Sequence, residues 1–315
     1  MAAFQIDLAL SSFVQASFQD AGTYLASQGA VPFVDVPKQT GKYHVFNSKG
    51  MIGSPENRVA MAANGGYNRT RLLGTTASFA LEKYGHEILT PLDDIANADF
   101  SLLETDAMAA AEHVMNKMER DVQALLQTST NFLAANRNTL TGTDQWSDDN
   151  SDPRNDCQTA IRAIRLSSFN SPGRLVARTN EAVLHRLQRH PLIRDQLKYT
   201  DGETPDAAKL ARYLGLDELL VGLSVKDSAA NGQDAVGAAI WTDSFSIVKV
   251  PTGRATPFQD CHSKLFRWQR DGVTGMQIQR YEEQATDMHI TRARAWWDPV
   301  VTNSSAGYII IDCLA

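Results

Sequence analysis

Residues 105–130 read TDAMAAAEHVMNKMERDVQALLQTST, and this stretch decides the fold. Its apolar residues recur at alternating steps of three and four, the spacing that lines one face of an α-helix. No Pro or Gly interrupts it, and Thr105 or Asp106 is suited to cap its start. Glu112 and Glu119 fall on the side expected to face water. The stretch predicts one unbroken helix, about 37 Å long at ~1.5 Å per residue. Its apolar positions are Met108, Ala111, Met115, Met118, Val122 and Leu125.

Composition places the chain among ordinary folded proteins and argues against several functional classes. It has 315 residues, of which 43% are hydrophobic and 21% charged, and its net charge of -6 indicates no general basic surface for nucleic acid. Cys157, Cys261 and Cys313 form no C-x-x-C, which argues against a disulfide framework and a thiolate zinc site. No run approaches the ~20 apolar residues of a membrane span, and residues 1–20 lack a signal-peptide charge pattern. We expect synthesis in the cytosol.

The segments before the helix predict an arm and a projection. Residues 1–29 are apolar enough to dock on another surface. Residues 31–46 and 75–92 alternate as strands do, and the segment between them carries Arg and Asn residues and a Gly-Gly pair without periodicity. A two-stranded projection fits this pattern, and such a ribbon needs a neighbour to lie on because two strands alone bury little surface.

The segment after the helix is rich in carboxylates, at Asp144, Asp148, Asp149 and Asp152. A calcium loop would require a D-x-D-x-D-G register and a distal Glu, which are absent. We instead expect Asp152 to cap a helix that begins at Pro153 and buries Ala160, Ile161 and Ile164, with Arg162 and Arg165 facing water or a neighbouring molecule.

Beyond residue 172 strands and helices alternate, which predicts a small α/β lobe. Thr179 is expected to cap one helix, and Thr204-Pro205 to open another that Gly215 closes. Strands at 219–222, 235–241 and 245–250 are expected to form the mixed sheet of this lobe. The last segment, from residue 285, is expected to form a two-stranded hairpin that turns at 303–307 and packs on the long helix, so that the lobe is an insertion.

Searches for catalytic patterns identify no active site. The sequence contains neither G-x-x-x-x-G-K-[ST] nor G-x-G-x-x-G. Ser224 lacks the second Gly of a nucleophile elbow, and adjacency of Cys261 and His262 does not provide a nucleophile–base geometry. Trp296 and Trp297 should face opposite sides of a strand, one in the core and one at an interface, and so cannot form one base-stacking platform. We expect no enzyme activity, no cofactor and no metal site.

Several short segments follow one another in a characteristic order. They are VPFVDVP at 31–37 with GKYHVF at 41–46, ALEKYGHEI at 80–88, LTGTDQWSD at 140–148 with Ser151-Asp152-Pro153, Arg189-His190-Pro191 through 198–200, LLVG at 219–222, Ile240-Trp241 and AGYII at 306–310. In these segments and their order the chain resembles the major capsid proteins of tailed bacteriophages. The resemblance implies an α+β capsid fold with an N-terminal arm at 1–38, an extended loop at 39–92, a peripheral domain with a spine helix at 93–152 and 279–315, and an axial domain at 153–278.

The family implies a structural protein that self-assembles into pentamers and hexamers of an icosahedral head, which encloses phage DNA without sequence-specific binding. It also implies a portal, decoration proteins and a scaffolding protein, which we expect to be a separate chain, with assembly in the host cytoplasm and a final place in the virion capsid. We expect the loop tip to contact a neighbouring subunit through Glu56, Arg58, Arg69 and Arg71. The alternatives are an encapsulin-like compartment of the same fold and a hydrolase built on the α/β lobe around Ser224 or Cys261.

Overall fold

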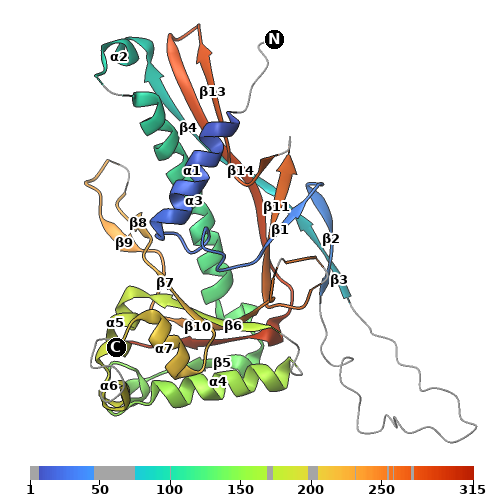
Figure 1. Cartoon of the computed structure of the whole chain (residues 1–315), viewed down its shortest axis with the longest axis vertical. Helices are drawn as coiled ribbons and strands as arrows, with labels where there is room; N and C mark the ends of the chain where they lie inside the picture. The colour runs from blue at the N-terminus through green and yellow to red at the C-terminus, as the bar shows by residue number, and fades with distance from the viewer. Residues whose placement is uncertain are drawn as a thin grey trace, which may run out of the picture.

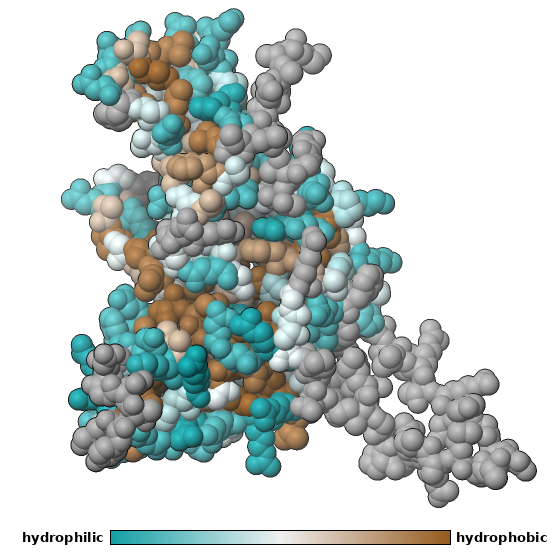
Figure 2. Space-filling view, in the orientation of Figure 1, coloured by the Kyte–Doolittle hydropathy of each residue, from teal (hydrophilic) through white to brown (hydrophobic). Residues whose placement is uncertain are grey.

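The computed structural model describes residues 7–45, 75–99, 101–168, 173–197, 205–230, 232–253, 255–257, 259–270 and 273–315. A long helix, α3 (Leu102–Gln127), runs along a six-stranded sheet, and a second sheet with its own helices lies at the C-terminal end of α3 (Figure 1). The chain therefore mixes helix and sheet in two parts that follow one another along its long axis, and hydrophilic and hydrophobic residues are mixed over the visible face (Figure 2). Within the described residues, no helix has the length and apolarity needed to cross a bilayer.

The spine helix α3 is unbroken, as its periodicity predicts, but it begins earlier than expected. Ser101 occupies the position before the first turn, so neither Thr105 nor Asp106 caps it. The predicted stripe is buried from Ala111 to Leu125, and Met108 packs partly buried against it. Glu112 is exposed, but Glu119 is completely buried, so the prediction that it faces water is wrong.

The six-stranded sheet is built around β14, which pairs with β4 along one edge and with β13 and then β11 along the other. The strand β1 adds in parallel to β11. The helix α3 covers one face and buries Ala110, Val114 and Val122 there. The strands are β1 (Phe33–Val36), β4 (Glu82–Pro91), β11 (Ser263–Arg270), β12 (Val273–Thr274), β13 (Gln277–Glu283) and β14 (Met288–Val301).

Strand β4 lies in this sheet and not in the projecting ribbon, which corrects the expectation for residues 82–91. It pairs antiparallel with β14 over ten residues, from Glu82 opposite Trp297 to Pro91 opposite Met288. The Tyr84 ring stacks on Trp297 with 4.2 Å between ring centroids. In the sheet, Tyr84 and Ile88 of β4 pack against the core beneath α3, and two strands projecting into water would lack this burial.

The projecting ribbon consists of β2 (Thr40–Val45) and β3 (Thr75–Ala80), which pair antiparallel. Figure 1 shows it leaving the six-stranded sheet to one side. A second two-stranded ribbon, β8 (Val225–Asp227) with β9 (Gly237–Ala239), leaves the other side of the molecule. The expectation that residues 235–241 belong to the sheet of the lobe is therefore wrong, because β9 pairs with β8.

The five-stranded sheet has the order β5-β15-β10-β6-β7 and forms the centre of the α/β lobe. Its strands are β5 (Arg137–Thr139), β6 (Arg174–Asn180), β7 (Glu218–Gly222), β10 (Phe245–Val250) and β15 (Gly307–Ile311). The lobe's helices are α4 (Pro153–Ser167), α5 (Glu181–Arg189), α6 (Pro191–Leu197) and α7 (Ala207–Leu214).

The last strand corrects the expected closing hairpin. Strand β15 pairs with β10 and β5 of the lobe and not with β14, so the chain crosses between sheets after Val301. Ile309 faces the core beneath α3, whereas Tyr308 and Ile310 face the core of the lobe. A strand with two buried faces is stable only inside a sheet covered on both sides, which the lobe provides and a terminal hairpin does not.

Local helix signals in the lobe are largely as predicted. Asp152 accepts a hydrogen bond from the Asn155 backbone N–H, and Pro153 occupies the first turn of α4. Gly215 ends α7 with a left-handed φ of 83°. Two helices are capped by a residue other than the one predicted. Asn180 caps α5 where Thr179 was expected, and Asp206 caps α7 where Thr204 was expected.

The N-terminal arm docks on the chain's own sheet. Helix α1 (Leu8–Ala21) starts after Asp7, whose side chain accepts a hydrogen bond from the Leu10 backbone N–H. Ser11 Oγ accepts a 2.9 Å bond from the Ile278 backbone N–H on β13. The remaining short elements are α2 (Leu92–Asn97) and the 3-10 turns Ser129–Asn131, Ala134–Asn136, Gly142–Asp144 and Ser304–Ala306.

Candidate functional site

The root of the projecting ribbon is fixed to the sheet by an aromatic cluster. Phe79 of β3 stacks on Phe266 of β11 with 4.4 Å between ring centroids, and Tyr43 of β2 lies 5.7 Å from the same ring. Trp296 of β14 completes this cluster, which is separate from the core beneath α3. Asp298 accepts a 3.0 Å hydrogen bond from the Ala80 backbone N–H. The body of the molecule therefore sets the direction in which the ribbon leaves.

Gly41 lets the two strands of the ribbon approach this cluster. It lies opposite Phe79, and a Cβ atom at position 41 would be 2.6 Å from Phe79 Cζ. That separation is well below van der Waals contact, so any side chain at position 41 displaces the Phe79 ring. Gly41 thus serves a packing function at the root of the ribbon.

The sequence-predicted contact residues belong to the segment that joins the two strands of this ribbon. Glu56, Arg58, Arg69 and Arg71 lie outside the described residues, and their role stays a prediction. The described strands fix both ends of the segment, because Val45 pairs with Thr75 at the outer end of the ribbon.

A second junction between parts of the chain, after the aromatic root of the ribbon, is formed by Glu119 of α3, which is buried beneath the arm. Its carboxylate accepts hydrogen bonds from the backbone N–H groups of Leu25 and Ala26, at 3.0 and 2.7 Å. It also accepts a 2.6 Å bond from Trp241 Nε1 and a 3.2 Å bond from Ser224 Oγ. Burial raises the pKa of Glu119 above its ordinary value, although the four donors oppose that shift. One side chain of α3 thus holds the arm and the two connections that flank β8 and β9.

Sequence reasoning missed Glu119 because it assigned charged residues of the helix to the solvent side. A signal was present: Glu119 lies four residues after Met115 and three before Val122, and both are buried. Positions at this spacing share one face of a helix, so Glu119 belongs to the edge of the apolar stripe.

Arg178 of β6 makes a further tie between the arm and the lobe. It is completely buried and donates hydrogen bonds to the backbone carbonyls of Ala30 and Val176. Burial lowers the pKa of Arg178 to about 9, while the more distant Glu218 opposes the shift. The arm, the spine helix and the lobe are thereby linked through buried polar groups, which are expensive to separate.

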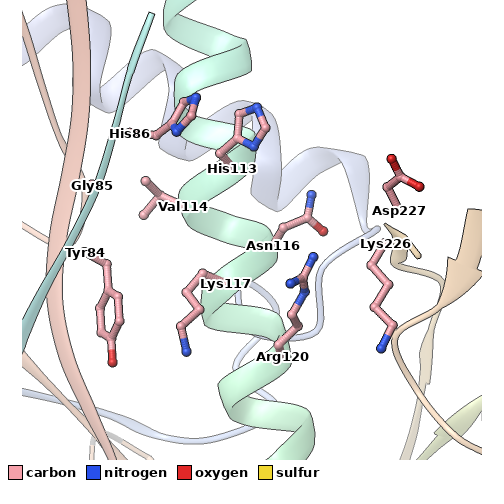
Figure 3. A pocket seen from close by; sticks show the side chains of 10 residues that line it. All are labelled: Tyr84, Gly85, His86, His113, Val114, Asn116, Lys117, Arg120, Lys226 and Asp227. Atoms are coloured by element: carbon pink, nitrogen blue, oxygen red, sulfur yellow. The ribbon is translucent and has the colours of Figure 1, made fainter. Parts of the chain in front are cut away.

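A hollow of about 390 Å³ lies over the exposed face of α3, between β4 and β8. Figure 3 shows His86 and His113 side by side, with Lys117 and Arg120 further along the helix and Lys226 across from them. The two imidazole centroids are 4.0 Å apart, and burial, followed by the nearby His113, lowers the pKa of His86. Lys117 pairs with Asp121 at 2.5 Å. Among the described residues, no group of three or more His, Cys, Asp or Glu side chains has an arrangement that could hold a metal ion.

The residues considered for a hydrolase do not form a reactive pair. Ser224 is buried and bonded to Glu119, with no histidine among its described hydrogen-bond partners. Cys261 and His262 are both completely buried. Burial raises the pKa of the Cys261 thiol and lowers that of His262 to about 3. The His262 ring stacks on Phe132 at 4.5 Å. These surroundings favour core packing and keep both groups neutral.

The carboxylates between residues 144 and 152 have separate local roles. Asp148 accepts a 2.8 Å bond from the Asn150 backbone N–H, Asp149 pairs with Arg186 at 2.6 Å, and Asp152 caps α4. These contacts agree with the capping interpretation of the segment.

Trp296 and Trp297 face opposite sides of β14, as their alternation predicts, but both are buried within the chain. Trp297 packs in the core beneath α3 and donates a 2.9 Å hydrogen bond to Asp121, whereas Trp296 belongs to the ribbon root. The expected interface face of this strand is covered by the chain's own ribbon.

Comparison with known proteins supports one fold. No family model matches the sequence. A major capsid protein of Pseudomonas phage JBD67 is 27% identical over 228 residues, which cover 69% of each chain. A phage-related protein from Bordetella bronchiseptica has a similar structure, with a TM-score of 0.74 and 18% identity over 99% of this chain and 98% of that one.

Two further structures share the fold at lower identity. The virus-like particle of Pyrococcus furiosus matches with a TM-score of 0.58 and 10% identity over 96% of this chain and 98% of that one. The capsid of cyanophage P-SCSP1u matches with a TM-score of 0.56 and 7% identity over 89% of this chain and 86% of that one. The chain therefore has the capsid fold of tailed bacteriophages and is similar in sequence to a phage major capsid protein.

Proposed function

We propose that this protein is a major capsid protein, a structural subunit that assembles with copies of itself into the icosahedral head enclosing phage DNA. The observation that carries the proposal is a capsid-type fold along nearly the whole chain together with sequence similarity to a phage major capsid protein. The role is structural and not enzymatic. The buried surroundings of Ser224 and Cys261 support this assignment.

The mechanism we infer uses the two junctions described above. The aromatic root holds the ribbon at a defined angle to the sheet, and Glu119 with Arg178 holds the arm and lobe on the spine. A rigid subunit with a projecting ribbon can place that ribbon across a neighbouring copy. Repeated heterologous contacts of this kind close into rings, which we infer to be pentamers and hexamers. Assembly then stabilises the folded state of each subunit by mass action.

We propose the charged segment between β2 and β3, with Glu56, Arg58, Arg69 and Arg71, as part of the contact between subunits. The support is its place between the two strands of a ribbon that projects from the body. We propose further that residues 1–38, 39–92, 93–152 with 279–315, and 153–278 correspond to the arm, extended loop, peripheral domain and axial domain. The pairing of β4 and of β15 argues for moving residues 82–91 into the peripheral part and residues 307–311 into the axial part.

A portal, decoration proteins and a separate scaffolding protein complete the proposed set of partners, with assembly in the host cytoplasm. Electron microscopy of the purified recombinant chain, after sizing by sedimentation, tests the central proposal. Closed shells, tubes or free pentamers and hexamers are the expected result. A monomer that stays monomeric in the presence of crowding agents contradicts it.

An encapsulin-like compartment is the alternative function, because the virus-like particle of Pyrococcus furiosus shares this fold. The two functions are distinguished by what the shells contain. The shells are recovered from cells in which the complete set of phage proteins is expressed. Mass spectrometry and nuclease digestion are expected to find DNA, whereas a packaged enzyme would support the compartment.

A further inference from the structure

Positive charge is concentrated in one part of a chain that is acidic overall. Residues 153–215 contain nine Arg and two Lys against six Asp and Glu, a net charge of +5, whereas the whole chain carries -6. The rest of the chain therefore carries -11. Such an internal asymmetry indicates a surface for an anionic partner, which the overall composition conceals.

Four of these arginines meet in one groove of the lobe. Arg154, Arg162 and Arg165 of α4 and Arg212 of α7 line a hollow of about 360 Å³. Arg162, Arg165 and Arg212 are exposed at its rim. Its remaining wall is formed by Gln158, Ile161, Tyr213, Leu214 and Gly215. Figure 1 shows α4 and α7 at the end of the molecule opposite α2. We call this hollow the arginine groove.

The guanidinium groups of the arginine groove are not neutralised within the described part of the chain. None of the four forms an ion pair there, although Arg174 and Arg186 of the same lobe pair with Glu218 and Asp149. Arg154 is held by neutral groups only: it donates a 2.8 Å bond to Gln196 Oε1 and lies 4.8 Å from the centre of the Tyr213 ring. Within the described residues, the four guanidinium groups of the groove thus keep their positive charge unpaired.

The chemistry of the groove fits phosphate oxygens. A guanidinium presents planar paired donors that match phosphate, and it stays charged at every physiological pH. Arg162 and Arg165 are three residues apart on α4, so their Cβ atoms lie about 5–6 Å from each other on one face. Duplex DNA offers a continuous series of phosphates, one charge per ~1.7 Å of helix axis. Several arginines of one groove can therefore engage neighbouring phosphates.

We propose that the arginine groove binds the phosphate backbone of double-stranded DNA without sequence preference, and that this end of the lobe faces the packaged genome. The inference rests on the proposed capsid function. Packaged DNA is repelled by an acidic subunit wall, and the repulsion is least where the subunit exposes unpaired arginines. The groove has no described carboxylate in its wall that would oppose a phosphate.

The test compares DNA binding of matched variants. Arg162→Gln with Arg165→Gln removes two cations from the groove. Arg120→Gln with Lys226→Gln removes two from the hollow over α3 and serves as the control of equal charge. Fluorescence anisotropy with a short labelled duplex of mixed sequence is measured over a series of salt concentrations, and circular dichroism verifies that each variant is folded.

The groove variant is expected to bind on the order of 10- to 100-fold more weakly at about 0.05 M salt, and its log-log salt slope should fall by about two. Arg162→Lys with Arg165→Lys should retain most of the slope because the charges remain. If the double glutamine variant does not fold, Arg212→Gln alone should lower the slope by about one. Equal losses in the groove and control variants, or an unchanged slope, overturn the proposal.

Electron microscopy of the same variants separates this inference from the proposed function. Shells that form normally but bind DNA weakly support both. Loss of shells with unchanged DNA binding assigns the groove to an acidic surface of a second copy and overturns the DNA proposal. If the wild-type chain binds DNA through the groove but never assembles, the capsid function fails while the groove assignment stands.

Discussion

The indole N–H of Trp241 donates a 2.6 Å hydrogen bond to the carboxylate of Glu119, across 122 positions of sequence. This contact joins the spine helix to the connection between β9 and β10. The same carboxylate holds the backbone of Leu25 and Ala26. One buried acceptor of the spine helix therefore contacts the arm and the connection that leads into the lobe.

Glu119→Gln should destabilise the subunit. The amide retains one oxygen as an acceptor. Its NH₂ group, however, faces the donors that contact Glu119, at a site where every partner donates. Leaving a buried donor unpaired costs about 1–3 kcal/mol, so the free energy of unfolding should fall by about 2 kcal/mol in urea titrations of the unassembled chain. Glu104→Gln, on the exposed first turn of α3, is the matched control and should change stability by less than about 0.5 kcal/mol. Equal effects of the two substitutions would refute a special role for Glu119.

Gly41→Ala should disturb the ribbon root. The new Cβ would lie 2.6 Å from Phe79 Cζ, so the ring has to leave its stack with Phe266, at a cost of about 1–3 kcal/mol. Gly237→Ala, in the other ribbon, places its Cβ 3.4 Å from Val225 Cγ1 and is the milder control. Thermal unfolding compares the two.

Phe79→Leu should partly rescue Gly41→Ala, because the smaller side chain frees space for the Cβ atom. A double-mutant cycle should show a coupling of about 1 kcal/mol between positions 41 and 79. Additive effects would mean that the clash is relieved elsewhere.

His262 should make stability depend on pH. Its folded-state pKa is about 3 because of burial, followed by the nearby positive charge of Arg178, against 6.5 in the unfolded chain. The unfolded state binds the proton first, so this contribution is complete above pH 6.5 and is lost as pH falls from 6.5 toward 3. The slope is about 1.4 kcal/mol per pH unit for one proton.

His262→Phe should flatten this dependence by one proton, because a phenyl ring can still stack on Phe132 but does not titrate. Urea unfolding from pH 7 to pH 5 measures the slope. An unchanged slope in His262→Phe would show that His262 is not the group responsible.

Arg58→Glu with Arg71→Glu should impair assembly without unfolding the subunit. If the segment between β2 and β3 pairs with a neighbour, two reversed charges convert attraction into repulsion, and this effect weakens at high salt. Sedimentation and electron microscopy should find fewer closed shells, with a circular dichroism melt close to that of the wild-type chain. Formation of normal shells by the variant would contradict the proposed contact between subunits.

Several features followed from the sequence because they are local. The three-and-four spacing of apolar residues determined the spine helix, Asp152 with Pro153 determined the start of α4, and Gly215 determined the end of α7. Each signal acts within one element, where backbone geometry fixes which neighbours meet. The order of these elements was enough to indicate the capsid fold.

Tertiary structure alone decided the features that join distant segments. The sequence predicted a closing strand after the turn at 303–307, but only the two buried faces of residues 307–311 placed that strand between β10 and β5 and not beside β14. Likewise, the burial of Glu119 depends on backbone N–H groups 93 and 94 residues away. The arginine groove exists because α4 and α7 pack together, which brings Arg212 to Arg162 and Arg165. Periodicity determines which face of an element is apolar. Packing among all elements at once selects the partner of that face, because the free energy of burial depends on how well the surfaces fit and not on their distance in the sequence.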